Sequence, residues 1–176
     1  MKRLLSIWHR REGAAAAEMA LVAPILLVLL FGSVELGHYF YSEHKLVKAV
    51  RDGARFAARQ RLTNYASCSG NVPMAVYDDT KNMVRRGSLN TSDTDLLPNW
   101  DDAGMSFSVT MTCVATLTDS GNTMAPSGIY AGMTSGAPAV SVTARLPYQS
   151  VIAGGFGVSW SGLNLNASEV AAVAGL

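Results

Sequence analysis

The stretch Arg10-Arg11-Glu12-Gly13-Ala14-Ala15-Ala16-Ala17-Glu18 stands directly before an apolar run from Met19 to Val34. From Gly13 to Val34 the sole ionisable side chain is that of Glu18. These 22 residues would span about 33 Å as a helix, which is enough to cross the hydrocarbon core of a bilayer. The sequence therefore predicts a membrane-spanning helix near the N-terminus.

A cleaved secretory signal is an alternative interpretation of this stretch. Its peptidase requires small residues one and three positions before the cut, after the apolar core. Cutting after Gly32 would place Leu30 at the upstream position. Cutting after Ser33 would place Phe31 there. The small residues instead precede the apolar run, next to the basic leader, so an ordinary signal is disfavoured.

A charged leader that ends in glycine, followed by a small residue, by glutamate at the fifth position and by an apolar run, is the pattern of type IV prepilins and pseudopilins. Over roughly the first 60 residues the chain resembles the TadE-type minor pseudopilins of the tight-adherence (Tad/Flp) pilus system, and TadF-like membership stays open. The matching residues are Glu12-Gly13, the alanines, Glu18, Ala20-Leu21-Val22-Ala23-Pro24, Phe31-Gly32, Glu35-Leu36-Gly37 and Val50-Arg51-Asp52-Gly53-Ala54-Arg55.

The resemblance implies a minor pilin that initiates, primes or caps a pilus, and that a prepilin peptidase cuts between Gly13 and Ala14. The implied partners are this peptidase, the major pilin, other minor pilins, the inner-membrane assembly platform and membrane lipid. We expect no catalytic residue, metal or cofactor. The rival hypothesis is a periplasmic binding or adhesive domain tethered by an uncleaved signal anchor. An enzyme is more distant, because the sequence contains no triad, metal cluster or phosphate loop.

Charge sets the expected topology of the chain. The leader carries Lys2, Arg3, Arg10 and Arg11 against Glu12, which predicts a cytoplasmic N-terminus and an exported remainder at the bacterial inner membrane. Without residues 1–13 the formal charge changes from +1 to −2, with 10 basic and 12 acidic residues left. A processed protein of this charge is not expected to bind nucleic acid.

Four segments are expected along the chain. Residues 1–13 form the leader, 14–36 the transmembrane half of a long helix, 37–62 its exported amphipathic half and 63–176 a periplasmic head. Helical periodicity continues from Leu36 to about Arg61. Pro24 removes one amide donor from this helix and favours a kink.

The expected head is an α+β domain. A second helix is predicted from Pro73 to Arg86, and an acidic connection follows from Ser88 to Gly104. Alternating apolar residues predict three strands that form an antiparallel sheet. The strand positions are Met105 to Leu117, Val140 to Leu146, and a third, bulged at Gly162, marked by Val158, Trp160, Leu163, Leu165 and Ala167; Asp119 to Pro138 is expected to be a long loop.

Glu18 is the residue from which we expect the clearest role. A carboxylate within a bilayer costs at least about 2.5 kcal/mol, so it requires a partner. After cleavage, the ammonium of Ala14 on a neighbouring subunit would be that partner and would set subunit registry. The alternative is a carboxylate that only reaches back to the cytoplasmic interface.

Two further features of the exported part carry predictions. Cys68 and Cys113 are expected to form one disulfide, because an exported domain is in an oxidising compartment. A basic stripe flanks the apolar face of the upper helix. It is either a solvated face, or it pairs with the acidic segment 93–102 of the same or a neighbouring subunit, or it meets anionic lipid head groups. The stripe consists of Lys45, Lys48, Arg51, Arg55 and Arg59.

Overall fold

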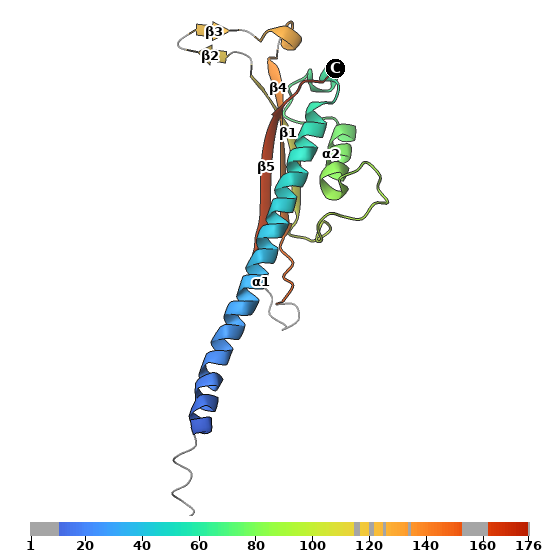
Figure 1. Ribbon diagram of the computed structural model, residues 1–176. Helices are drawn as coiled ribbons and strands as arrows, with labels where there is room; N and C mark the ends of the chain where they lie inside the picture. The colour runs from blue at the N-terminus through green and yellow to red at the C-terminus, as the bar shows by residue number, and fades with distance from the viewer. Residues whose placement is uncertain are drawn as a thin grey trace, which may run out of the picture. The chain divides into compact units, whose positions relative to one another are not determined.

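The computed structural model describes residues 11–114, 117–119, 122–124, 126–133, 135–152 and 162–175. Two α-helices and a three-stranded antiparallel sheet confirm the predicted α+β fold class (Figure 1). The elements are α1 (Arg11–Ala58), η2 (Leu62–Tyr65), α2 (Met74–Arg86), β1 (Ser106–Val114), β2 (Leu117–Asp119), β3 (Asn122–Met124), η3 (Gly128–Tyr130), β4 (Ala137–Pro147) and β5 (Asn164–Ala172).

The chain divides into two compact units. The helical unit combines Met1–Tyr39 with Ser150–Ser159. The globular unit combines Phe40–Gln149 with Trp160–Leu176. Helix α1 contributes to both units, since its 48 residues continue past Tyr39.

Helix α1 ends at Ala58, slightly earlier than the periodicity predicted, because other groups take over its last carbonyls. The Tyr65 hydroxyl donates to the Ala57 carbonyl at 2.6 Å, and the Ala174 amide donates to the Ala58 carbonyl at 2.9 Å. These bonds satisfy acceptors that every helix end leaves without an intrahelical partner. The C-terminal segment therefore fixes the end of α1.

Helix α2 matches its prediction to within one residue. Pro73 precedes its first turn, and Gly87 ends it in the left-handed conformation with φ 75°. The Gly87 amide donates to the Met83 carbonyl at 2.8 Å. Glycine is favoured at this position because it adopts a positive φ without a Cβ penalty.

The sheet has the order β1-β4-β5, so β4 is the central strand. Val142 on β4 pairs with Val109 on β1 and with Glu169 on β5. Pro138 and Pro147 lie near the two ends of β4, where the loss of an amide donor disturbs the ladder least. The buried side of β4 is formed by Val140, Val142, Ala144 and Leu146.

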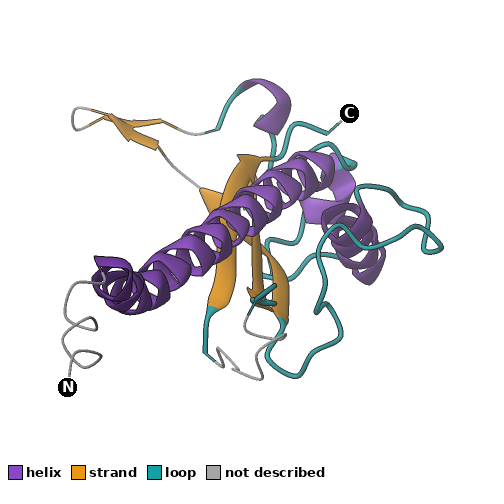
Figure 2. Ribbon diagram, turned by 60° about the horizontal axis from the view of Figure 1, so that its bottom comes forward, coloured by secondary structure: helices purple, strands orange, loops and turns teal. Residues whose placement is uncertain are grey.

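Within the globular unit, α1 runs across one face of the sheet and α2 lies beside it (Figure 2). Helix α1 contributes small and branched apolar side chains to the core, and the loop after α2 adds the buried Trp100. Trp100 and Tyr77 each meet Phe107 edge to face, with ring centroids 6.3 and 5.5 Å apart. The buried residues of α1 in this unit include Leu46, Val50, Ala54 and Ala57.

Three details of the strands differ from the prediction. The first strand ends at Val114 instead of Leu117. Part of the expected long loop forms a hairpin, in which β2 pairs with β3 as a separate two-stranded sheet. The third strand begins at Asn164 and continues to Ala172, while Val158 and Trp160, which were expected to belong to it, lie outside the described residues.

Candidate interaction site along the N-terminal helix

The junction between Gly13 and Ala14 lies in the first turns of α1, and both residues are exposed. A Cβ built on Gly13 would have no atom within 4 Å among the described residues. Nothing in the described part of the chain therefore covers this junction.

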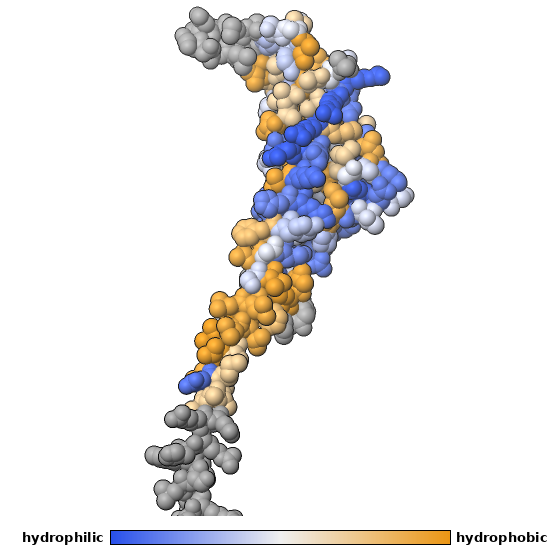
Figure 3. Space-filling model, in the orientation of Figure 1, coloured by the Kyte–Doolittle hydropathy of each residue, from blue (hydrophilic) through white to orange (hydrophobic). Residues whose placement is uncertain are grey.

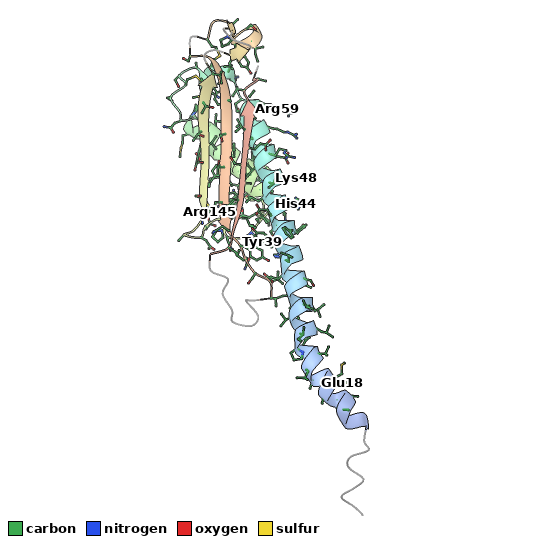
Figure 4. All side chains as sticks on the ribbon, turned by 90° about the vertical axis from the view of Figure 1, so that its left-hand side faces the viewer. Glu18, Tyr39, His44, Lys48, Arg59 and Arg145 are labelled. Atoms are coloured by element: carbon green, nitrogen blue, oxygen red, sulfur yellow. A yellow bond between two sulfur atoms is a disulfide. The ribbon has the colours of Figure 1, made fainter. Side chains whose placement is uncertain are left out.

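Glu18 lies on the same exposed part of α1, four residues after Ala14 (Figure 4). Figure 3 shows that hydrophobic side chains gather along this part of the helix, whereas hydrophilic ones gather over its continuation in the globular unit. The most apolar window of the helix has a mean hydropathy of 2.3 and is 0% buried by the described residues. An exposed apolar helix of this length fits a single-pass membrane anchor.

Pro24 lies inside α1, and the helix is continuous on both sides of it. Ser33 donates from its hydroxyl to the Leu30 carbonyl at 2.8 Å, so this polar side chain is satisfied within its own helix. The kink expected at Pro24 stays a prediction.

The basic stripe lies on α1 in the globular unit, where Lys48, Arg51, Arg55 and Arg59 are exposed and Lys45 is half-buried. Figure 4 labels Lys48 and Arg59 along this part of the helix. The Arg51 guanidinium lies 3.9 Å from the Glu169 carboxylate of β5, and the Lys45 ammonium lies 5.9 Å from the centre of the Tyr41 ring. The Arg51–Glu169 ion pair is exposed, and exposed ion pairs contribute little stability.

The acidic segment 93–102 is bound by arginines of α2. Arg85 donates to Asp95 at 2.6 Å and forms two hydrogen bonds with Asp101, at 3.0 and 2.8 Å. Arg86 lies 3.5 Å from Asp95. The hydrogen bonds to Asp95 and Asp101 raise the pKa of Arg85 further, and the hydrogen bond from Arg85 lowers the pKa of the Asp101 carboxyl. The arginines of α2 were not among the predicted site residues. Their place in the last turn of the helix is the sequence feature that could have pointed to them.

Cys68 and Cys113 are joined in a disulfide, with their Cα atoms 6.0 Å apart. The segment after Cys68 runs beside β1, because the Met111 amide donates to the Gly70 carbonyl at 3.0 Å and Asn71 forms a bridge with Thr110. The disulfide therefore attaches the connection between the two helices to an edge strand of the sheet.

Two glutamates on α1, Glu35 and Glu43, contact later segments of the chain. Glu35 accepts a hydrogen bond from the Ile152 amide at 3.0 Å, and Glu43 accepts one from the Asn166 amide at 3.4 Å. The sequence feature that could have pointed to Glu35 is its position directly after the apolar run. In the part of the chain that the structure describes, no three His, Cys, Asp or Glu side chains gather to hold a metal ion.

The described residues combine an apolar N-terminal helix, long enough to cross a membrane, with an α+β unit that contains a three-stranded antiparallel sheet. The TadE-like protein family model matches residues 13–55, which confirms the predicted resemblance, and this segment of the chain is TadE-like. No curated protein and no solved structure matches the chain.

A TadE-like segment indicates a minor pilin associated with the Tad pilus, in a pilin family that is structural rather than catalytic. The match suggests pilus-related partners in general. The matched residues include Gly13, Ala14, Glu18, Pro24 and the basic stripe except Arg59.

Proposed function

We propose that the chain is a minor pilin or pseudopilin that initiates, primes or caps a Tad/Flp adhesive pilus. The observation that carries this proposal is the start of the TadE-like match at Gly13, where the basic leader meets the exposed apolar helix. In this account a prepilin peptidase removes residues 1–13, and the protein itself catalyses no reaction.

The proposed arrangement places residues 14–36 in the inner membrane. Residues 37–62 continue the helix on the periplasmic side, and residues 63–176 form the periplasmic head. The excess of lysine and arginine in the leader supports a cytoplasmic N-terminus. The proposed partners are the prepilin peptidase, the major and other minor pilins, the assembly platform and membrane lipid.

Glu18 would pair with the ammonium of Ala14 on a neighbouring subunit. Both positions are exposed on the apolar part of α1, which supports a role between helices rather than within one. In a low-dielectric environment this attraction is strong, and its net value after desolvation is about a few kcal/mol. It would fix the axial register of adjacent helices.

The basic stripe would meet an acidic face of a neighbouring pilin subunit. Two observations support this partner: four of the five side chains are exposed, and Asp95 and Asp101 of the chain's own acidic segment already pair with Arg85. Anionic lipid head groups are the competing partner, and a purely solvated face is the third possibility.

A complementation experiment tests the proposed function. The wild-type gene should restore pili to a deletion strain, whereas Glu18→Gln should be made and inserted but should restore few pili and few crosslinks to other pilins. Glutamine has nearly the same size as glutamate, so the variant removes only the charge. Asp79→Asn, at an exposed carboxylate of α2, is the matched control and should restore piliation.

Two outcomes would contradict different parts of the proposal. Wild-type piliation by Glu18→Gln would rule out the registry role, and Glu18 would then be only an interfacial residue. Normal pili in the deletion strain itself would rule out the assembly function.

A further inference from the structure

Glu35 is buried although it lies in an exposed stretch of α1. Glu35 is 8% exposed, whereas Val34 and Leu36 on either side are 51% and 54% exposed. Its Oε2 atom accepts a hydrogen bond from the Ile152 amide at 3.0 Å, within the helical unit. The segment Ser150–Ile152, which follows β4, therefore lies against the helix at Glu35.

The position of Glu35 relates this contact to the membrane. It is next to the last residue of the proposed span 14–36, at the depth where the hydrocarbon core meets the head groups. Irregular backbone at such a depth is tolerated only where protein or water satisfies its polar groups, because an unpaired amide in lipid is costly. The Glu35 carboxylate supplies the acceptor that the Ile152 amide requires.

The composition of this segment suits the membrane interface. Val151 is 57% exposed and Ile152 is half-buried, so apolar surface remains available after the segment has packed on the helix. The sequence from Ser150 to Gly162 contains no ionisable side chain. An uncharged segment with exposed apolar side chains gains free energy by entering the boundary between head groups and acyl chains.

We propose that Glu35 holds the segment Ser150–Ile152 at the bilayer interface, where Val151 contacts lipid beside the spanning helix. Glu35 is then a positioning residue, and the bilayer contacts the chain at a second segment in addition to α1. This inference rests on the proposed function in one respect, because it requires residues 14–36 to span the membrane.

Fluorescence quenching of the full-length protein in phosphatidylcholine liposomes tests the proposal. A polarity-sensitive dye is attached to one introduced cysteine while the Cys68–Cys113 disulfide stays oxidised. The labelled positions are Val151→Cys, Leu26→Cys as the control within the span, and Asn90→Cys as the control on the globular unit. Lipids with a nitroxide near the head group report contact with the interface, and iodide reports exposure to water.

We expect the dye at residue 151 to be quenched by the nitroxide lipid and protected from iodide, unlike the dye at residue 90. Glu35→Leu should abolish the lipid quenching at residue 151 and expose the dye to iodide. Glu35→Gln should preserve the lipid quenching, because its amide oxygen can still accept the Ile152 hydrogen bond.

The controls separate the possible failures. Iodide quenching at residue 151 as strong as at residue 90, with residue 26 protected from iodide, would overturn the inference and leave the span in place. Unchanged lipid quenching in Glu35→Leu would overturn the positioning role. A dye at residue 26 that iodide quenches as strongly as the dye at residue 90 would overturn the membrane span, and with it the proposed function and this inference.

Discussion

Gly53 on α1 and Val84 on α2 touch so closely that a Cβ added to Gly53 would collide with the Val84 side chain. Both residues are buried, and Thr80 on the same face of α2 is also fully buried. The absence of a side chain at Gly53 is therefore what allows the two helices to pack at this distance.

Gly53→Ala should destabilise the globular unit. Alanine favours a helix by about 1 kcal/mol over glycine, but overpacking a core costs about 1–3 kcal/mol, and the branched Val84 side chain has little rotamer freedom to move away. We expect a net loss of up to about 2 kcal/mol in the free energy of unfolding. Denaturation of the full-length protein in detergent measures it.

Gly37→Ala is the control for this prediction, since a Cβ at Gly37 has no described atom within 4 Å. It should leave stability unchanged or raised. Adding Val84→Ala to Gly53→Ala should relieve part of the overpacking, as a double-mutant cycle would detect. A Gly53→Ala protein as stable as Gly37→Ala would show that the helices do not pack this closely.

The Cys68–Cys113 bridge should contribute to stability through the loop that it closes. The two cysteines are 45 residues apart, and closing a loop of this length stabilises a fold by up to about 4 kcal/mol on the chain-entropy model. Replacing both cysteines by serine should lower the unfolding midpoint accordingly. Alkylation without reductant should add no mass to the native protein, and the addition of two alkyl groups would count against the bridge.

Tyr65 should make stability depend on alkaline pH. Burial raises its pKa from 10.0 to about 12, so its contribution is fully present below pH 10.0 and is lost as the pH rises towards about 12. Tyr65→Phe should remove this dependence, and losing the hydrogen bond to Ala57 should cost about 1 kcal/mol at neutral pH. The free energy of unfolding across this pH range is the measurement. Tyr41→Phe, at an exposed ring, should behave as wild type; the same alkaline loss in Tyr65→Phe would refute the assignment.

Arg85 should hold the connection between α2 and β1 in place. Arg85→Gln removes the bonds to Asp95 and Asp101 and should speed amide hydrogen exchange in residues 88–104, measured by mass spectrometry. Asp102→Asn, at an exposed carboxylate that makes no ion pair with the described residues, is the control. Equal exchange in the two variants would mean that other contacts, such as Arg86 with Asp95 and the packing of Leu97 and Trp100, fix the segment.

Local patterns predicted the helices and the sheet well. Pro73 and Gly87 bound α2 within one residue, and alternation located the central strand. The last strand was predicted too short because Glu169 occupies a position on the helix-facing side, where alternation requires an apolar residue. It is tolerated there because Arg51 of α1 lies beside it, a contact that depends on the tertiary fold.

Candidate site residues could be predicted only where the signal lies within one segment. Gly13, Ala14 and Glu18 follow each other on one helix, so their relation is visible in the sequence. The contact of Glu35 with Ile152 joins residues 117 positions apart, and no local pattern specifies it. The hairpin of β2 and β3 had one local signal, Ser120-Gly121, which is a common turn dipeptide.

Cleavage between Gly13 and Ala14 can be measured directly at the N-terminus of the mature protein. Mass spectrometry of the N-terminal peptide should be carried out on membranes from pilus-producing cells and from the same cells without the prepilin peptidase. We expect a chain that begins at Ala14 in the first sample and an uncut leader in the second. An intact Met1 terminus in both samples would contradict it and would favour a domain tethered by an uncleaved signal anchor.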